Sequence, residues 1–204
     1  MNIVTNLPLK DQIAAVLRQE IAAGSLADGE ELTQESVAAA LAVSRIPVRE
    51  AFLQLETEGL LRRLPNRHVQ VVGLTPRRRR QNLRMLAALE CEAARLLAET
   101  WNIQLPLSAF QALAAGGASP EQDAAFHRAL FQALDNPTLE QQHLIQRRSL
   151  FDHAARPLSA DRAMQLDAAM VQAMQQQDTE GLCAAIRTYY DACFEEPLYE
   201  SETH

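Results

Sequence analysis

The nine residues Val43-Ser-Arg-Ile-Pro-Val-Arg-Glu-Ala51 decide how the first third of this 204-residue sequence folds. Ser44 is a favourable N-cap, and Pro47 falls in the first helical turn, where its missing N–H costs nothing. Gly59 is a favourable residue for closing the helix. The segment therefore predicts a helix that begins after Ser44 and ends at Gly59. Its inward face is formed by apolar residues at helical spacing, namely Val48, Ala51, Phe52 and Leu55.

The flanking sequence predicts two helices before this one and a hairpin after it. Apolar residues at helical spacing run through residues 9–23, and a shorter helix begins after Thr33, a good N-cap. Short β-prone runs at 60–63 and 68–72 flank a turn at Pro65-Asn66. The order helix, helix, helix, hairpin is typical of a winged helix-turn-helix.

Two arginines lie near the start of the helix that follows Ser44. Arg45 and Arg49 are four residues apart, so they project from one helix face. The first residues of a recognition helix enter the major groove of DNA, where an arginine fork binds guanine O6 and N7. Glu50 is interpreted as orienting an arginine. The alternative interpretation of the two arginines is a solvated helix face with surface ion pairs.

Other residues of this region suit contacts with the DNA backbone. The hydroxyl groups of Thr33 and Ser44, together with exposed N–H groups at helix starts, favour phosphate contacts that fix position without reading sequence. Arg67 and His68 lie at the predicted wing tip, within reach of a backbone or the minor groove. The complete set of predicted DNA-binding residues is Thr33, Ser44, Arg45, Pro47, Arg49, Arg67 and His68.

Three strings give residues 8–74 a specific resemblance to the GntR family of regulators. They are residues 21–32, residues 43–51 and residues 55–61, of which the second is the most specific. The resemblance implies a winged helix-turn-helix that binds DNA. Two positions that are usually glycine in the family are Ala42 and His68 here. We expect a slightly altered turn at Ala42, and at His68 a possible contact in place of a flexible pivot.

Composition limits the class of protein. The formal net charge is −7, so any contact with DNA must come from locally concentrated arginine. No charged-then-apolar signal and no apolar run of about 18 residues is present, which excludes a membrane span and predicts a soluble cytoplasmic protein. Three scattered cysteines do not form a disulfide framework or a zinc knuckle.

The rest of the sequence predicts a second, all-helical domain. Gly73 to Pro76 reads as a linker, which places a DNA-binding domain at 1–74 and an effector-binding and dimerisation domain at 75–204. The predicted fold class is mainly α, with the winged helix-turn-helix followed by an antiparallel six-helix bundle. Several helices have a proline near their start. Their predicted spans are 76–100, 105–115, 120–134, 137–155, 159–176 and 179–195.

The helical half resembles the FadR-type C-terminal (FCD-like) domain of the same family. The matching strings are residues 89–97 and 123–130, with Asn136-Pro137 after them. Asp123 and His127 are four residues apart on one helix face, a spacing found in metal sites, and zinc or nickel suits these ligands. The alternatives are direct binding of an organic ligand through hydrogen bonds, or an ordinary intrahelical pair.

The resemblance implies further residues for this site. The positions of two ligating histidines in relatives fall at Asp167 and Tyr189, and an arginine usually found four residues before Glu90 is replaced by Leu86, with Arg84 close by. A tyrosine ligates poorly unless it is deprotonated. The predicted effector-binding residues are Asp123, His127, Asp167, Tyr189 and Arg84, and the predicted divalent-metal ligands are Asp123 and His127 with Asp167.

Some remaining polar and aromatic residues receive structural interpretations. His143 and His153 show no matching partner spacing and are interpreted as surface or interhelix residues. Trp101 and Phe110 are interpreted as core. The run Arg77 to Arg80 is interpreted as a solvated helix start with interdomain salt bridges, or as a contact with phosphate.

The sequence as a whole predicts a homodimeric transcriptional repressor without catalytic residues. Two recognition helices would meet an inverted repeat in double-stranded DNA, and a small effector, such as a carboxylic acid, would release it. Two alternatives stay open at this point. One is a winged-helix module that binds protein, and the other is a metal-dependent helical-bundle enzyme, for which no second carboxylate–histidine pair is found.

Overall fold

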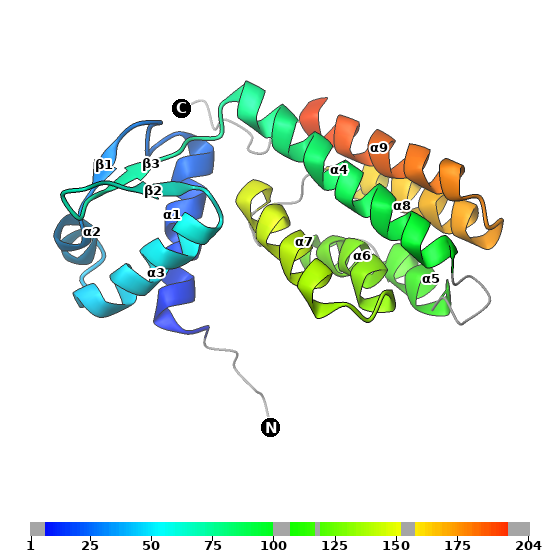
Figure 1. Ribbon diagram of the computed structural model, residues 1–204, viewed down its shortest axis with the longest axis horizontal. Coiled ribbons are helices and arrows are strands. Elements are labelled where there is room, and N and C mark those ends of the chain that lie inside the picture. Colours follow the sequence, from blue (N-terminus) through cyan, green and yellow to red (C-terminus); the bar gives the residue numbers. More distant parts are fainter. Residues whose placement is uncertain (1–6, 100–106, 117–118, 152–157, 196–204) are drawn as a thin grey trace. The chain divides into compact units, whose positions relative to one another are not determined.

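The computed structural model describes residues 7–99, 107–116, 119–151 and 158–195. The chain divides into two compact units, the first ending at Thr75 and the second beginning at Pro76 (Figure 1). The predicted fold class, mainly α with a winged helix-turn-helix followed by a helical region, is confirmed. Trp101 and His153, interpreted above, lie outside the described residues.

Residues 7–75 of the first unit form three helices and a small antiparallel sheet. The strands lie in the order β1-β3-β2, with Glu31 opposite Gln70 and Leu61 opposite Val71. The hairpin β2-β3 is the wing, and the two-residue strand β1 was not anticipated from the sequence. In chain order the elements are α1 (Leu9–Ala23), β1 (Glu31–Leu32), α2 (Gln34–Ala40), α3 (Arg45–Thr57), β2 (Leu61–Arg63) and β3 (Val69–Val71).

Helix α3 is held by a continuous apolar core. Its inward residues Val48, Ala51 and Leu55 are completely buried and pack with α1 and the sheet. Helix α2 begins with a capping box, in which the Thr33 hydroxyl accepts from the Ser36 N–H at 3.0 Å and the Ser36 hydroxyl lies near the Thr33 N–H. The apolar face predicted from the sequence therefore fixes which side of α3 remains exposed.

One buried ion pair crosses this core. The Arg18 guanidinium of α1 donates to both carboxylate oxygens of Glu58, just after α3, at 2.9 Å each. Both side chains are almost fully buried. Such a bidentate pair requires one relative placement of its helices, because either charge alone would be buried without compensation. Arg18–Glu58 therefore fixes the register of α1 against α3.

Two residues of the first unit adopt left-handed backbone conformations without being glycine. Ala42 has φ 53° in the turn between α2 and α3, where the Val43 N–H still donates to the Ala38 carbonyl at 3.0 Å. Alanine therefore takes the strained left-handed conformation itself, and the slight alteration expected of this turn stays a prediction. At the wing tip the left-handed residue is Arg67 (φ 67°), so His68 does not stand at the pivot position.

The second unit contains six helices in the residues that the structure describes. Helix α4 packs most extensively against α9, and it also contacts α6 and α7, while α8 packs against α9 and α5. Ser119 and Asn136 cap α6 and α7, each followed by proline at the first helical position. The helices are α4 (Pro76–Ala98), α5 (Leu107–Gly116), α6 (Pro120–Ala133), α7 (Pro137–Leu150), α8 (Ala160–Gln175) and α9 (Thr179–Glu195).

The start of α4 is attached to the end of α9. The Arg80 guanidinium lies 4.2 Å from the centroid of the Phe194 ring, and Arg79 donates to the Cys193 carbonyl. Phe110, interpreted as core, is fully buried and meets Phe126 edge to face at 5.7 Å. Within the described ranges no helix combines the length and the apolar character needed to cross a bilayer.

The left-handed alanine generates a stability prediction. We expect Ala42→Gly to leave the free energy of unfolding unchanged or to raise it by up to about 1 kcal/mol, because relief of the strained backbone offsets the entropy of glycine. Ala15→Gly, in the middle of α1, should instead lower it by about 1 kcal/mol. Urea unfolding followed by circular dichroism measures both, and equal losses would contradict the assignment of strain to Ala42.

Candidate nucleic-acid interface and buried polar cluster

A groove in the first unit gathers residues from α2, the start of α3 and the wing. Its volume is about 530 Å³. It brings together five of the seven residues predicted to bind DNA, whereas Ser44 and Pro47 lie at the start of α3 without lining it. The lining residues are Thr33, Gln34, Glu35, Arg45, Arg49, Arg63, Asn66, Arg67 and His68.

The groove is basic and its charges are exposed. Four arginines line it against the single carboxylate of Glu35, which lies 2.7 Å from the Arg45 guanidinium. Both side chains of this pair are about two-thirds exposed, at 64% and 63%. Exposed pairs contribute little stability, so an incoming anion can compete for Arg45.

The wing tip is held by hydrogen bonds of its own. The His68 N–H donates to the Asn66 side-chain oxygen at 3.1 Å, and the Leu64 N–H donates to the His68 carbonyl at 2.9 Å. His68 Nδ1 also lies 3.3 Å from a Glu31 carboxylate oxygen. Arg67 is thus presented at a fixed turn. The sequence did not predict the other residues that line the groove, because the fold of the wing determines which residues come together there. These residues are Gln34, Glu35, Arg63 and Asn66.

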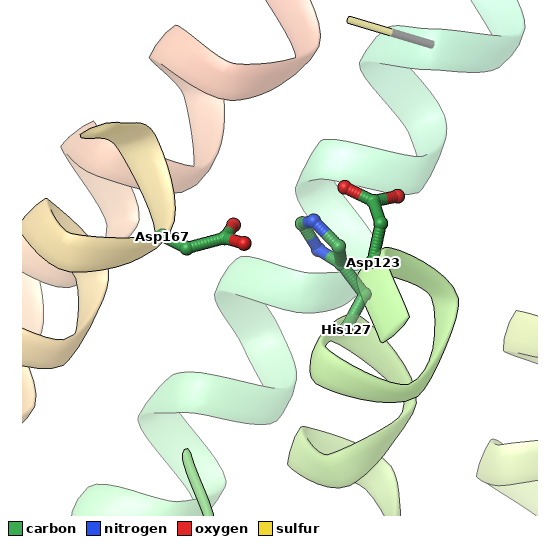
Figure 2. Close-up of side chains that lie close together, drawn as sticks. All are labelled: Asp123, His127 and Asp167. Atoms are coloured by element: carbon green, nitrogen blue, oxygen red, sulfur yellow. The ribbon is translucent and has the colours of Figure 1, made fainter. Parts of the chain in front are cut away.

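The second candidate site is a buried polar cluster between α6 and α8. Asp123 and His127 come from α6 and Asp167 comes from α8, and one ligand atom from each lies within 4.8 Å of the others. All three side chains are buried, and Figure 2 shows the Asp167 carboxylate facing the two α6 residues. The structure thus brings together the three residues named above as metal ligands.

Only one of the two imidazole nitrogens of His127 has a hydrogen-bond partner in the described structure. Nδ1 lies 2.8 Å from Glu90 Oε2, whereas the buried Nε2 has no hydrogen-bond partner in the described structure. Burial lowers the pKa of His127, but the Glu90 carboxylate outweighs it, so the pKa is raised overall. An imidazole nitrogen binds a metal ion only without its proton, so protonation and metal binding would compete at Nε2.

These residues fit a divalent metal. An imidazole nitrogen and two carboxylate oxygens are three protein ligands of the kind that zinc accepts, with a further position left for water or a ligand. The contact between His127 Nδ1 and Glu90 is the outer hydrogen bond that ligating histidines commonly make. Figure 2 shows the imidazole lying between the Asp123 and Asp167 carboxylates.

Glu90 of α4 contacts polar residues on three other helices of the cluster. Its carboxylate contacts His127, His143 Nε2 at 2.9 Å, and the hydroxyl of Tyr190, which donates to it. Burial raises the pKa of Glu90, but the charge and hydrogen bonds of His127 and His143 together lower it well below its usual range. Glu90 is therefore an ionised acceptor for donors from three other helices.

Asp123 accepts hydrogen bonds from two further side chains, which do not use all the lone pairs of its carboxylate. The Tyr189 hydroxyl lies 2.7 and 2.9 Å from its two oxygens, and Arg147 donates to Oδ2. Burial and the Asp123 charge raise the pKa of Tyr189 well above its usual value, so Tyr189 stays a phenol that donates. Arg147 also lies 3.4 Å from the Tyr190 hydroxyl, which links the two halves of the network.

Arg84 does not join this cluster. Its side chain is exposed and lines a groove along α4 and α9, whereas Leu86 is fully buried. Two residues correspond to about 200° around a helix, so Arg84 points away from the face that carries Leu86. A cation that does contact the cluster is Arg147, which pairs with Asp123 and was not predicted from the sequence.

Of the two interpretations of His143, surface or interhelix residue, the structure supports the second. It is completely buried, with its ring stacked on Phe131 at 4.3 Å and its Nε2 at Glu90. A signal was present in the sequence, because His143 and Arg147 are one helical turn apart on the buried face that also carries Leu150. Polar residues within an apolar stripe require buried partners.

Comparison with known proteins decides the family of the first unit. Residues 9–71 match the family described as "Bacterial regulatory proteins, gntR family". The first unit is a GntR-family helix-turn-helix domain. The groove described above lies on the exposed side of this GntR domain, over the starts of α2 and α3 and the wing.

Two curated relatives carry the names of repressors. HTH-type transcriptional repressor RspR of Escherichia coli (strain K12) is 35% identical over 88 residues, 43% of this chain and 39% of that protein. The "Probable D-xylose utilization operon transcriptional repressor" of Paenarthrobacter nicotinovorans is 30% identical over 144 residues, 67% of this chain and 64% of that protein. The chain thus spans less than two thirds of either relative.

The fold extends over both units. The solved structure of E. coli McbR/YncC superposes with a TM-score of 0.61 at 23% identity, covering 93% of this chain and 98% of that one. At this identity the similarity establishes the fold alone. The GntR domain and the helical unit after it therefore occur together in a known architecture.

The buried cluster generates a second stability prediction. Arg147→Met should lower the free energy of unfolding by about 3–5 kcal/mol, because it leaves the Asp123 carboxylate buried without its cation. Arg128→Met, which removes an exposed pair with Glu140, should cost less than about 1 kcal/mol. Urea unfolding measures both variants. Adding Asp123→Asn to Arg147→Met should recover part of the loss, and a further loss would refute the pairing.

Proposed function

We propose that this chain is a sequence-specific DNA-binding transcriptional repressor controlled by a small effector. The observation that carries the proposal is the basic groove of the GntR domain, in which residues from α2, α3 and the wing converge. A groove lined by four arginines and one glutamate suits a polyanion, although the chain as a whole carries a formal charge of −7.

The arrangement of α3 supports reading of bases. Arg45 and Arg49 lie one turn apart at its exposed N-terminal end, where a recognition helix enters the major groove. The guanidinium of each can form two hydrogen bonds with guanine. Arg67, on the wing, suits a phosphate or the minor groove. Ser44 makes no side-chain cap bond, so its hydroxyl is available for a phosphate.

We propose that two copies of the chain bind an inverted repeat. A single recognition helix contacts few base pairs, and two-fold symmetry doubles the contacts on a palindromic site. The repressor names of the two relatives support negative regulation. The fold and the family are those of regulators, and we propose no catalytic activity.

The buried cluster is the proposed effector site. Asp123, His127 and Asp167 would hold a divalent metal, zinc or nickel, which supplies a Lewis acid for an anionic ligand. Arg147 adds a buried cation beside Asp123. A small carboxylic acid is the ligand class that this combination favours, because metal and guanidinium both attract carboxylate oxygens.

A binding experiment tests the DNA function. Selection from random duplexes should yield a preferred sequence, and Arg45→Ala with Arg49→Ala should weaken its binding at least about 100-fold, because two bidentate base contacts are lost. Fluorescence anisotropy at fixed salt measures the affinity. Arg128→Ala with Arg162→Ala removes the same charge from exposed positions of α6 and α8 and should leave it unchanged. Unchanged affinity in the first variant would instead favour a module that binds protein.

Metal titration tests the effector site. Metal-stripped protein should bind Zn²⁺ or Ni²⁺ in calorimetry, and Asp167→Asn should weaken binding at least about tenfold because a carboxylate ligand is lost. Asp161→Asn, at an exposed position of the same helix, is the matched control. Binding should tighten as the pH rises, because the raised pKa of His127 lets protons compete for Nε2. Equal metal affinity in wild type and Asp167→Asn would place the metal elsewhere.

A further inference from the structure

Ile46 is the most exposed large apolar side chain in the described part of the chain. It is 73% exposed, on the first turn of α3. The neighbouring positions of the helix follow the expected pattern, with Val48 completely buried and Arg45 exposed. Ile46 therefore contributes nothing to the core of the GntR domain, and its side chain is exposed to a partner that approaches the start of α3.

The position of Ile46 relative to the arginines indicates what it meets. It directly follows Arg45 and precedes Arg49 by three residues, so all three side chains project from the exposed first turns of α3. Because both guanidinium groups line the basic groove, this end of the helix suits a negatively charged partner. A phosphate backbone offers a branched hydrocarbon side chain no favourable contact.

The major groove does offer an apolar group. Thymine is the only DNA base with a methyl group on its major-groove edge, and apolar side chains read it by direct contact. We propose that Ile46 packs on the 5-methyl group of a thymine in the operator half-site, so that the GntR domain selects thymine beside the bases read by Arg45 and Arg49. The inference rests on the proposed DNA-binding function and adds a specificity-determining residue to it.

The test removes the methyl group and nothing else. The sequence selected by the wild-type protein is resynthesised with each thymine replaced in turn by deoxyuridine, which pairs identically but lacks the 5-methyl group. Replacement at the contacted position of one half-site should weaken binding about fourfold, the effect of one methyl group returned to water, and replacement in both half-sites about sixteenfold. Ile46→Ala should bind the thymine and deoxyuridine duplexes equally at that position.

A matched variant separates this contact from general effects on the helix face. Leu53 lies seven residues further along α3, is 44% exposed, and shares the face of Ile46. Leu53→Ala should keep the wild-type response to deoxyuridine. Because Ile46 is exposed, Ile46→Ala should retain the unfolding midpoint of the wild type, which excludes misfolding as the cause of a changed response.

Three outcomes would overturn the inference. Binding could be indifferent to deoxyuridine at every thymine, or Ile46→Ala could keep the wild-type response at the sensitive position. Loss of self-association by Ile46→Ala in sedimentation, with the response to deoxyuridine absent, would assign the side chain to a protein contact. Failure to select any sequence is a different result, because it removes the DNA-binding function itself.

Discussion

The second unit depends on the buried carboxylate of Glu90. It reaches from α4 to His127 of α6, His143 of α7 and Tyr190 of α9, so a single group joins four helices. An ionised carboxylate without these donors would be strongly unfavourable in an apolar interior. The helices must therefore pack so that all three donors converge, which restricts the bundle more than apolar contacts alone, since those tolerate sliding.

The hydrogen bond between Glu90 and His127 also orients a residue of the candidate metal site. Nδ1 of His127 is engaged by Glu90 and Nε2 has no hydrogen-bond partner in the described structure, while the imidazole lies between the Asp123 and Asp167 carboxylates (Figure 2). A ligating group is thus oriented by a partner on another helix rather than by its own rotamer preference. In the first unit, Arg18–Glu58 plays the corresponding part for α1 and α3, and it holds α3 with its basic end exposed.

The fold of the GntR domain could be predicted from the sequence because the signals that define its helices lie within a few residues of one another. The cap, the proline in the first turn and the apolar spacing of α3 all act within a few residues, and Arg45 and Arg49 share a face by helical geometry alone. Strand β1 was not predicted, because a strand of two residues shows no periodicity in the sequence. Its pairing partner β3 also lies far along the chain.

The buried cluster was predicted only in part because its other members depend on packing between helices. Asp123 and His127 form a pair within α6, which spacing reveals. Glu90, His143 and Arg147 acquire their roles only when α4 and α7 meet α6, and a single sequence does not specify those crossings. The choice of Arg84 failed for a different reason, because two residues turn about 200° around a helix and Arg84 therefore lies on the side opposite Leu86.

The carboxylate of Glu35 gives the basic groove an internal competitor for Arg45. A duplex that draws this guanidinium toward its bases must first separate it from Glu35, and it also brings phosphates toward a negative charge. On an arbitrary sequence, Arg45 would exchange the Glu35 carboxylate for a phosphate, which gains little binding free energy. A guanine at the right position would instead accept two hydrogen bonds from Arg45. In the proposed DNA-binding function, the acidic residue would therefore shorten the time spent on random DNA relative to the time spent on the operator.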